Sequence, residues 1–329
     1  MMIRWGIAST GKMAEGFVRD FAHVPDATIT AVGSRRPESA GDFAARHGIA
    51  TAHGSYRALV EDPDVDVIYV ATPHPQHHAI ARAAIEAGKA VLVEKAFTAT
   101  LAGAEDLVGL ARERGVFCME AMWTRFQPIV EHARELIAAG EIGDVRMAQA
   151  DLGAFRAYDA EDRLFAPHLG GGATLDLGVY VVSIAEHFLG RPDRVHTAGT
   201  LFPNGADASV SILLGYDNGR SASLLASLEG ETPGRAVVAG TKGSIELVPR
   251  FHHPDTLILR RNGQPAETIV RAPVGRGYCH EAIEVNRCLS LGLTESPVMP
   301  LQDTLDVQWT MEQVLGQLGI THTEDPTPI

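Results

Sequence analysis

Three side chains with acid–base chemistry stand where the sequence predicts that a strand ends or a helix turns. Lys95 follows the apolar run 91–93 through Glu94, and Asp176 and Tyr180 lie four residues apart in a helical pattern after three glycines. Residues four apart share one face of a helix. Hydride transfer between an alcohol carbon and a nicotinamide ring needs such groups, because the ring handles only the hydride and the hydroxyl proton must go elsewhere. We therefore take Lys95, Asp176 and Tyr180 as candidate catalytic residues of an oxidation or reduction.

The roles within this trio have two assignments. Tyr180 is the first candidate for proton transfer: a free tyrosine has a pKa of about 10, so a nearby cation such as Lys95 must stabilise its ionised form near neutrality. Asp176 would then orient the substrate or the lysine. In the reverse assignment Lys95 itself exchanges the proton and Tyr180 binds the substrate. Each residue alone is also compatible with a surface position, so the interpretation depends on all three.

A glycine turn between the first strand and the first helix predicts a nucleotide site. The residues Ser9-Thr10-Gly11-Lys12-Met13-Ala14 occupy the place of the G-x-G-x-x-G/A turn, with Ser9 instead of its first glycine. The central glycine lets the backbone approach a pyrophosphate, which the helix N-terminus stabilises. An ordinary strand-to-helix turn is the alternative. We expect cofactor contacts from Ser9, Thr10, Gly11, Lys12 and Met13.

The same turn also resembles a phosphoryl-transfer loop. Residues 6–12 read GxxxxGK, but Met13 stands where a Ser or Thr hydroxyl would hold magnesium. Asp66 precedes the apolar run of its strand rather than closing it, so the aspartate that would assist the metal is missing. These departures disfavour phosphoryl transfer.

The end of the second predicted strand indicates which dinucleotide is bound. Ser34, Arg35 and Arg36 stand where an NAD-specific chain places an acid on the ribose hydroxyls, and no acid is present. A hydroxyl and two guanidinium groups suit a 2′-phosphate, through paired charge-assisted hydrogen bonds. A solvated basic turn is the alternative. The expected cofactor is NADP rather than NAD.

Two further loops are expected at the cofactor. The residues expected to contact the cofactor are Thr72, Pro73, His74 and His77 in the first of these loops, and Glu94 and Lys95 in the second. The first of these loops reads H-x-x-H-H, but a metal site needs three or four converging ligands, and no cysteine or evident acidic partner accompanies the histidines. Pro75 and the apolar residues after it indicate the start of a helix instead. No metal is expected, and the histidines are expected to line the cofactor edge or to cap the helix.

Aromatic and basic residues after the last strand of this half are candidates for substrate contact. Trp123, Arg125 and Phe126 follow that strand directly. An aromatic face packs equally well against sugar C–H groups and benzene rings. Plain core packing is the alternative for Phe126, Phe155, Phe165 and Tyr278. The expected substrate contacts are Trp123, Arg125, Phe155, Phe165 and Tyr278.

Residues 1–120 have the pattern of a Rossmann dinucleotide-binding domain. Short apolar runs alternate with segments of helical period, which predicts a parallel sheet covered by helices. The expected strands are Ile3–Ala8, Thr28–Gly33, Val65–Ala71, Val91–Glu94 and Val116–Glu120. Met13, Phe17 and Phe21 are spaced four apart and give the first helix an apolar face.

Residues 121–329 have a different period and are expected to form an α+β domain for substrate binding and dimerisation. Apolar residues alternate with serines over 208–217 and 220–228, and Asp217-Asn218-Gly219 predicts a hairpin between them. Further strands are expected over 236–240, 244–248 and 257–261, and helices over 278–291 and 301–318. The fold class is therefore α/β, with a Rossmann domain and a large, mostly antiparallel sheet. Because a flat face of small residues lets a second sheet approach closely, we expect a homodimer through this sheet.

Composition narrows the class of protein. The chain has 329 residues, more than one hydrophobic core usually supports, with 45% hydrophobic and 21% charged residues as in compact globular proteins. A net charge of −13 without a basic block argues against nucleic acid as a partner. The absence of a signal-peptide pattern and of a run of about 20 apolar residues argues against secretion and membrane insertion. Three cysteines without a CxxC favour the reducing cytoplasm.

The order of motifs along the chain resembles the glucose-fructose oxidoreductase and inositol dehydrogenase family, and within it the dimeric dihydrodiol dehydrogenase and NADP-dependent D-xylose dehydrogenase branch. The motifs are STGKMA, ATPHPQHH, VEKAF, EAMWTRF, AGEIGDV, GGGATLDLGVY, GYCHEAIEVNRCL and SPVMPLQDTLDV. By this resemblance Lys95 matches the lysine of the family's E-K-P motif, with Ala96 in place of proline. Asp176 and Tyr180 match its D-x-x-x-H/Y motif, and His77 matches a loop histidine.

The resemblance implies an NADP-dependent oxidoreductase that transfers hydride between nicotinamide and a hydroxyl-bearing carbon of a sugar, a polyol or a trans-dihydrodiol. Tyr180 stands where the inositol dehydrogenases have a histidine, so their mechanism does not transfer directly. A catalytically silent NADP-binding sensor or regulatory protein is the alternative. Such a protein would not need Lys95, Asp176 and Tyr180 together.

Overall fold

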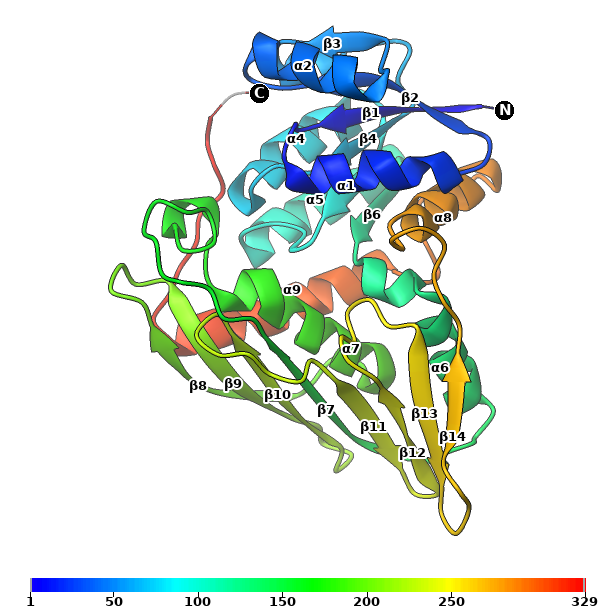
Figure 1. Ribbon diagram of the computed structural model, residues 1–329. Coiled ribbons are helices and arrows are strands. Elements are labelled where there is room, and N and C mark those ends of the chain that lie inside the picture. Colours follow the sequence, from blue (N-terminus) through cyan, green and yellow to red (C-terminus); the bar gives the residue numbers. More distant parts are fainter. Residues whose placement is uncertain (1, 328) are drawn as a thin grey trace. The chain divides into compact units, whose positions relative to one another are not determined.

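The computed structural model describes residues 2–327 and 329 (Figure 1). By its internal contacts the chain forms two compact units. Unit 1 contains the chain up to Met122, residues 274–305 and the segment from Thr323 onward. Unit 2 contains residues 123–273 and 306–322.

Unit 1 is built on a six-stranded parallel sheet in the order β3-β2-β1-β4-β5-β6. Its strands are β1 (Ile3–Ala8), β2 (Ala27–Gly33), β3 (Thr51–His53), β4 (Val67–Val70), β5 (Ala90–Glu94) and β6 (Cys118–Ala121). β4 and β5 are buried along their whole length, as expected of parallel strands that helices cover on both faces. The prediction of a Rossmann sheet is confirmed. The sequence did not reveal β3, because three residues are too few to show a hydrophobic period.

Helices connect and cover these strands. Unit 1 holds α1 (Lys12–Asp20), α2 (Pro37–His47), α3 (Tyr56–Val60), α4 (His74–Glu86), α5 (Leu101–Arg114) and α8 (Cys279–Ser290). On the apolar face predicted for α1, Phe17 is 1% exposed and its ring stacks on Tyr69 of β4, with the ring centroids 4.0 Å apart. Burial of such a side chain contributes roughly 1.5–3 kcal/mol. This contact fixes α1, and the turn before it, on the sheet.

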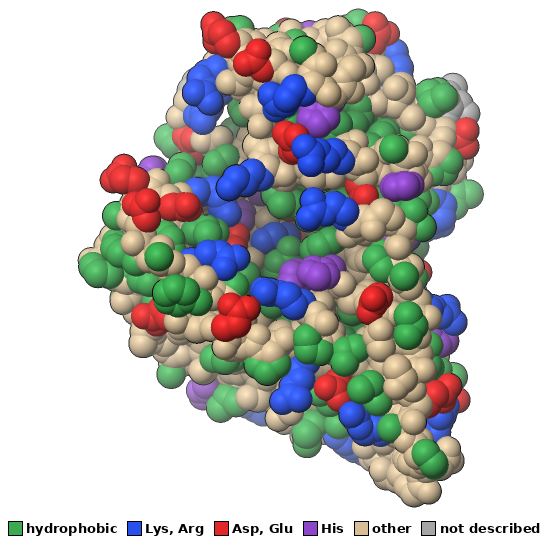
Figure 2. Space-filling view, in the orientation of Figure 1, with side chains coloured by type: hydrophobic (Ala, Val, Ile, Leu, Met, Phe, Trp, Pro, Cys, Tyr) green, Lys and Arg blue, Asp and Glu red, His purple; other side chains and the backbone are tan. Residues whose placement is uncertain are grey.

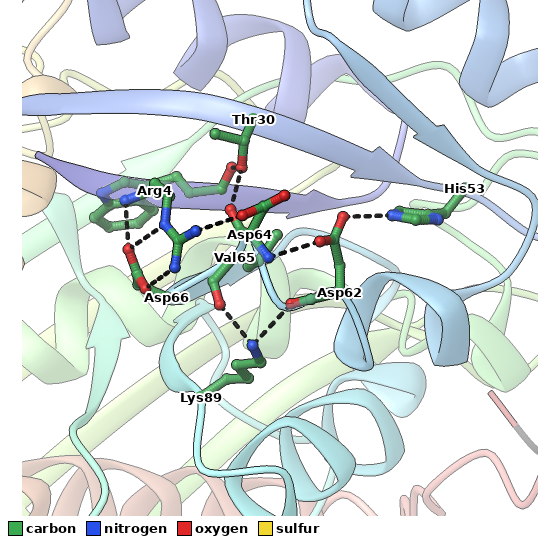
Figure 3. A network of polar contacts seen from close by, with 9 residues as sticks. Arg4, Thr30, His53, Asp62, Asp64, Val65, Asp66 and Lys89 are labelled. Atoms are coloured by element: carbon green, nitrogen blue, oxygen red, sulfur yellow. Dashed lines mark hydrogen bonds and ion pairs between the residues drawn. The ribbon is translucent and has the colours of Figure 1, made fainter.

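At the amino-terminal edge of the sheet, a polar network joins β1 to the loop before β4 (Figure 3). Arg4 donates to the Asp66 carboxylate at 2.8 and 3.0 Å. Lys89 donates to the carbonyl oxygens of Asp62 and Val65 at 2.8 and 2.7 Å. The hydrogen bond from Arg4 lowers the pKa of the Asp66 carboxyl. Asp66 is thus paired with Arg4 at the amino-terminal edge of the sheet. A metal-assisting aspartate of a phosphoryl-transfer loop would lie at the carboxyl edge, so this position agrees with the argument against such a loop.

The segment 274–305 belongs to unit 1, although the sequence assigned all of 121–329 to the second domain. The Asp20 carboxylate at the end of α1 accepts hydrogen bonds from the backbone of Arg276 at 2.7 Å and of Cys279 at 3.0 Å. It thereby satisfies N–H groups at the start of α8 that have no partner within the helix. Arg276 and Cys279 lie 256 and 259 positions after Asp20 in the sequence. Hydrophobic periodicity does not predict contacts between residues so far apart.

Helix α8 carries two glutamates in opposite environments. Glu281 is fully buried, and neither of its carboxyl oxygens has a hydrogen-bond partner among the described residues. Burial, together with the charges of Glu94 and Asp20, raises the pKa of Glu281 well above its usual range. Glu284 accepts two hydrogen bonds from Arg287, at 2.7 and 2.9 Å. Burial alone would raise its pKa, but these bonds lower the pKa of Glu284 overall.

Unit 2 is built on an eight-stranded sheet in the order β14-β13-β12-β11-β7-β10-β9-β8, in which β7 and β10 pair in parallel and the other neighbours antiparallel. Its strands are β7 (Val145–Gly153), β8 (Arg194–Leu201), β9 (Asp207–Gly215), β10 (Ser221–Ser227), β11 (Ala236–Gly240), β12 (Gly243–Leu247), β13 (Thr256–Arg261) and β14 (Glu267–Val270). Its helices are α6 (Pro128–Ala138), α7 (Val179–Leu189) and the part of α9 (Leu301–Gln317) after residue 305.

The alternation predicted for this sheet is confirmed, and with it the fold class. On β9, Val210, Ile212 and Leu214 are at most 1% exposed, whereas Ser211 and Leu213 lie on the open face. β9 and β10 form the expected antiparallel pair. α7 packs beside β7 on the covered face.

The surface carries both signs of charge. Figure 2 shows acidic and basic side chains interspersed over the face that it draws. With 41 acidic and 28 basic residues, the chain has an excess of negative charge, which repels polyanions. In the described part of the chain, no helix combines the length and apolarity that crossing a bilayer requires.

Replacement of Glu281 by Gln is expected to stabilise the protein, and more so at high than at low pH. A carboxyl group whose pKa is raised by folding makes the free energy of unfolding fall as pH rises above the pKa of the unfolded chain. Glutamine removes this penalty because it carries no charge. Urea unfolding at about pH 5 and about pH 8 measures the difference between Glu281→Gln and the wild type.

Glu284→Gln on the same helix is the matched control. It removes a carboxylate whose pKa is lowered by folding, so it should reduce stability, and the reduction should shrink as pH falls toward the carboxyl range. If both variants changed the free energy of unfolding with the same sign and the same pH dependence, the raised pKa of Glu281 would be contradicted.

Candidate functional site

The turn after β1 adopts a backbone that glycine favours. Ser9 has a φ of 151°, a value that other residues rarely adopt. Its Oγ accepts a hydrogen bond from the backbone of Gly11 at 3.0 Å. Gly11 and Lys12 are exposed at the start of α1, so this helix N-terminus is open to an anion. Ser9 thus takes the place of the first glycine of the motif and adopts a backbone conformation that glycine favours.

The register of the sheet brings four candidate segments to one edge. Ala8 pairs with Gly33 and with Val70, and Val70 pairs with Val93, so β1, β2, β4 and β5 end in step. The segments that follow these ends are 9–13, 34–36, 72–77 and 94–95. In doubly wound sheets, ligands bind outside this carboxyl edge.

The residues at this edge fit a negatively charged dinucleotide. Thr72 Oγ1 and Gln76 Oε1 are buried and have no hydrogen-bond partner among the described residues, although buried polar groups are normally paired. Arg35 and Arg36 are exposed cations in the loop after β2. Ser34 beside them is 7% exposed, and its Oγ accepts from the Arg36 backbone at 3.3 Å. The loop therefore presents two guanidinium groups on an ordered backbone.

His77 joins the loop after β4 to the loop after β5. It is fully buried, with Nε2 2.7 Å from the carbonyl oxygen of Thr72. Its Nδ1 lies 3.1 Å from the carbonyl oxygen of Ala96 and 3.3 Å from that of Phe97. The ring therefore lies between the backbones of these two loops, next to Lys95, and a neutral imidazole donates its single N–H to one of them. Its predicted contact with the cofactor stays a prediction.

The other two histidines of the loop have different surroundings. His74 is 4% exposed, and its ring meets that of His77 edge to face with the centroids 5.7 Å apart. His78 pairs with Asp106 of α5 at 2.7 Å. Over residues 2–327 and 329, no three His, Cys, Asp or Glu side chains are grouped as metal ligands would be.

Glu94 supports the backbone of Lys95. It is 6% exposed, and Tyr69 donates its phenolic hydrogen to Glu94 Oε1. The backbone N–H of Lys95 donates to Glu94 Oε2 at 3.2 Å. Burial, and then the charge of Glu94, raises the pKa of Tyr69, so its hydroxyl remains a donor. Glu94 thus orders the backbone at Lys95, whose side chain is half-buried. The predicted contacts of Glu94 and Lys95 with the cofactor stay predictions.

In unit 2, Tyr180 belongs to a cluster of four aromatic rings. The Trp123 indole donates to Tyr180 Oη at 3.0 Å, and the two side chains are 8% and 7% exposed. The His252 ring lies 5.2 Å from that of Tyr180 and 4.4 Å from that of His253. Sequence reasoning identified Trp123 and Tyr180 but missed His252 and His253. The pair follows a predicted strand in a loop without a motif, so only its two adjacent imidazoles could have drawn attention to it.

Asp176 lies in a helical turn that differs from the prediction. The sequence predicted one helix with Asp176 and Tyr180 on a single face, but Thr174–Gly178 is a π-helix and α7 begins at Val179. Such wide turns occur often at functional sites. Asp176 accepts a hydrogen bond from Arg163 at 3.2 Å. Arg163 was not among the predicted residues, because it lies in an irregular segment 13 positions earlier.

The remaining predicted substrate residues have different local surroundings. Arg125 is 1% exposed and donates to Ser183 Oγ of α7 at 3.2 Å. Phe165 is 1% exposed in an apolar cluster of unit 2, whereas Phe155 is 59% exposed. Tyr278 lies in unit 1, where burial raises its pKa to about 12. Their roles as substrate contacts stay predictions.

The parallel sheet, its glycine-like turn and the large second sheet define a two-domain nucleotide-dependent oxidoreductase. Residues 3–122 match the model of an oxidoreductase family with an NAD-binding Rossmann fold, and residues 130–246 match the GFO/IDH/MocA C-terminal domain. The chain belongs to the GFO/IDH/MocA family. The family recognised from the sequence motifs is thereby confirmed.

Relatives match almost the whole chain. The trans-1,2-dihydrobenzene-1,2-diol dehydrogenase of Xenopus tropicalis is 37% identical over 98% of this chain and 100% of its own length. The enzymes of that name from Mus musculus and Homo sapiens are 36% and 35% identical over 99% of both chains. These matches confirm the prediction of an NAD(P)-dependent enzyme of the dehydrogenase and reductase class.

Solved structures share the fold. The 3-ketoreductase KijD10 from Actinomadura kijaniata, in complex with NADP, is 26% identical over 99% of this chain and 100% of its own, with a TM-score of 0.80. Levoglucosan dehydrogenase, in complex with NADH and levoglucosan, covers 96% of this chain and 97% of its own with a TM-score of 0.88. At 21% identity this second likeness concerns the fold alone.

Replacement of His77 by Ala should lower the free energy of unfolding by about 1–3 kcal/mol, the cost of leaving a buried polar group unsatisfied. The carbonyl oxygens of Thr72, Ala96 and Phe97 would lose their shared partner. Urea unfolding followed by circular dichroism measures the change. His78→Ala is the control, because it removes a partly exposed pair that contributes less than about 1 kcal/mol. Equal losses in the two variants would refute the structural role of His77.

Proposed function

We propose that this protein is an NADP-dependent oxidoreductase that transfers hydride between nicotinamide and a hydroxyl-bearing carbon of a sugar, a polyol or a trans-dihydrodiol. The observation that carries the proposal is the hydrogen bond from Trp123 to Tyr180. In the same chain, β5 ends at Glu94, and Lys95 follows directly at the carboxyl edge of the sheet. Relatives named as trans-1,2-dihydrobenzene-1,2-diol dehydrogenases support this substrate class.

In this proposal Tyr180 exchanges the hydroxyl proton. A hydrogen bond donated to Oη, as Trp123 does at 3.0 Å, stabilises the phenolate relative to the phenol. Lys95 contributes a positive charge that favours the same form. Asp176, held by Arg163, orients the substrate hydroxyl. The nicotinamide, when bound, supplies or accepts the hydride.

The reverse assignment, with Lys95 as the proton donor, predicts a different response to Tyr180→Phe. If Tyr180 only binds substrate, its loss raises KM and leaves the pH dependence of kcat in place. If it exchanges the proton, kcat falls and its pH profile flattens. The two assignments are thus separable by one variant.

NADP is the proposed cofactor because the loop after β2 offers cations and no acid. Arg35 and Arg36 are exposed and suit the 2′-phosphate, whose two charges would be repelled by the acid found in NAD-specific chains. KijD10 was crystallised with NADP and levoglucosan dehydrogenase with NADH, so the fold accommodates either.

The main experiment follows the absorbance of reduced nicotinamide during incubation with aldoses, inositols, anhydro sugars and trans-dihydrodiols, each with NADP and with NAD. We expect turnover in at least one class, with the higher kcat/KM for NADP. Lys95→Ala should lower kcat by about 10²-fold or more and leave the affinity for NADPH within about threefold. Lys242→Ala, an exposed lysine between β11 and β12, is the matched control.

Full activity of Lys95→Ala would contradict its catalytic role. Binding of NADP without turnover across the whole panel would favour the alternative, a catalytically silent sensor.

We also propose that two copies associate through the open face of the unit 2 sheet. Leu213 on β9 and Met147 on β7 are 57% and 47% exposed on this face, on the two sides of β10. Ser211, Leu213 and Ser223 help to line a shallow hollow on this face. A second sheet can approach such a face closely and bury the exposed leucine.

Sedimentation should give twice the mass of the chain for the wild type. Leu213→Arg should shift it to the monomer, because a charge buried at the centre of an interface is costly. Leu291→Arg, at an equally exposed leucine of unit 1, should leave the dimer intact. A wild-type monomer at micromolar concentration would refute the proposal.

The proposed location is the cytoplasm. Cys118, Cys279 and Cys288 are all unpaired and buried. Burial raises the pKa of Cys279 to about 11, which keeps its thiol protonated. Unpaired thiols are typical of a reducing compartment.

A further inference from the structure

A buried aspartate at the start of β9 holds the turn that carries Asp176. Asp207 is 1% exposed, and its two neighbours in the sequence belong to an apolar cluster of unit 2. Its Oδ2 accepts hydrogen bonds from the backbone N–H of Thr174 at 2.5 Å and from the hydroxyl of Thr174 at 2.6 Å. The π-helix Thr174–Gly178 begins at this threonine. One carboxylate oxygen on a strand of the sheet thus engages both polar hydrogens of the residue at which the turn begins.

The last of the three glycines before this turn passes close to the same carboxylate. Gly172 has a φ of 130°, and a Cβ atom on it would lie 2.0 Å from Asp207 Oδ1, so a side chain at this position would collide with the carboxylate. The carbonyl oxygen of Gly172 accepts a hydrogen bond from the backbone N–H of Asp176 at 3.4 Å. Asp207 therefore contacts the chain at Gly172 and at Thr174, the two residues that lead into the turn.

These contacts extend to the carboxylate of Asp176. The backbone N–H of Gly172 donates to the carbonyl oxygen of Leu164 at 2.9 Å. Leu164 directly follows Arg163, whose guanidinium donates to Asp176 Oδ1 at 3.2 Å. Both the backbone and the side chain of Asp176 are thus bonded to segments that meet at Gly172, beside Asp207.

The form of this turn sets the direction of Asp176 relative to Tyr180. Backbone hydrogen bonds join residues five apart in a π-helix and four apart in an α-helix, so the two forms turn a given side chain by different angles. Tyr180 is the second residue of α7, directly after the turn. If the turn changed to an α-helix, Asp176 would therefore face in another direction while Tyr180 kept its place.

Asp207 reduces the stability of the protein. Burial raises the pKa of its carboxyl, and the hydrogen bonds from Thr174 offset this effect only in part. A carboxyl whose pKa is raised by folding lowers the free energy of unfolding at every pH at which it is ionised. Departures of this kind from a stable core are typical of functional sites.

We propose that Asp207 is a positioning residue of the candidate active site, which keeps Thr174–Gly178 in the π form and thereby directs Asp176 toward the substrate beside Tyr180. The inference rests on the proposed function, in which Asp176 orients the substrate hydroxyl. Asp207 acts on the reaction only through Asp176. All these residues belong to unit 2.

A double-mutant cycle with Asp176→Asn tests the proposal, using the best substrate of the panel above. kcat is measured per cofactor site, and the sites are counted by titrating the fluorescence of NADPH, so that loss of folded protein does not lower the value. Asp207→Ala should lower kcat about tenfold or more and leave the affinity for NADPH within about threefold. In the Asp176→Asn background the same replacement should lower kcat by less than about twofold, because residues that act through one another are not additive.

Thr174 tests the same contact from its other side. Thr174→Val keeps the shape of the side chain and removes the hydroxyl that donates to Asp207, whereas Thr174→Ser keeps that hydroxyl. The valine variant should lower kcat about threefold or more, and the serine variant should stay within about twofold of the wild type. This pair decides the proposal if Asp207→Ala does not fold.

Glu324→Ala is the matched control. Glu324 Oε1 accepts hydrogen bonds from the backbone N–H and the hydroxyl of Thr100 at 2.9 and 2.7 Å, which is the same pair of bonds at the start of α5 in unit 1. Its replacement removes an equivalent contact that does not lead to Asp176. kcat per cofactor site should stay within about twofold, with and without Asp176→Asn.

Equal falls in kcat on Asp207→Ala with and without Asp176→Asn would overturn the proposal. An unchanged kcat in Asp207→Ala, or in Thr174→Val where Asp207→Ala does not fold, would do the same. If the wild type turns over no substrate of the panel, the proposed function fails, and crystal structures of Asp207→Ala and Thr174→Val decide this inference. In them residues 174–178 should lose the π form and Asp176 its bond to Arg163, and an unchanged turn in both would overturn the inference.

Discussion

The hydrogen-bonded register of the parallel sheet in unit 1 is the constraint on which the rest of the structure depends. β1 pairs with β2 and β4, and β4 with β5, so that four functional loops leave the sheet at one edge. Side chains alternate along a strand, so a shift of one residue would turn each of them to the other face. Glu94, the last residue of β5, is buried and bonded to Tyr69 in the neighbouring strand only in the observed register. The backbone hydrogen bonds between the strands therefore bring three segments to one edge of the sheet. These are the turn after β1, the loop after β2 with Arg35 and Arg36, and the loop after β5 with Lys95.

Two buried polar side chains at this edge are hydrogen-bonded within the protein, whereas three cations there are exposed. His77 and Glu94 are buried, and each holds the backbone of a loop. Satisfied buried groups of this kind make a region rigid. Lys12, Arg35 and Arg36 are exposed cations, and a guanidinium keeps its full capacity to bind phosphate. The edge thus combines a hydrogen-bonded backbone with exposed positive charges, which suits a polyanionic ligand.

Elements with a strong period could be predicted from the sequence, and contacts between distant segments could not. β4 and β5 were predictable because a strand buried on both faces is a continuous apolar run. β9 and β10 were predictable because a strand buried on one face alternates apolar and polar residues. The return of 274–305 to unit 1 depends on hydrogen bonds to Asp20, which no local pattern announces. At the candidate site, Lys95 and Tyr180 were found through motifs, whereas the His252 and His253 rings were missed because a folded loop brings them to Tyr180.

The division of unit 1 along the chain also sets an order on its folding during synthesis. β1 to β6 leave the ribosome first. The hydrogen bonds that join Asp20 to the start of α8, and Thr100 to Glu324, can form only after those later segments have been synthesised. All eight strands of unit 2 lie between these segments in the sequence, so its sheet can close while the nucleotide-binding sheet still lacks a helix. During that interval the first half of the protein exposes apolar surface, which is the condition that chaperones recognise in nascent chains.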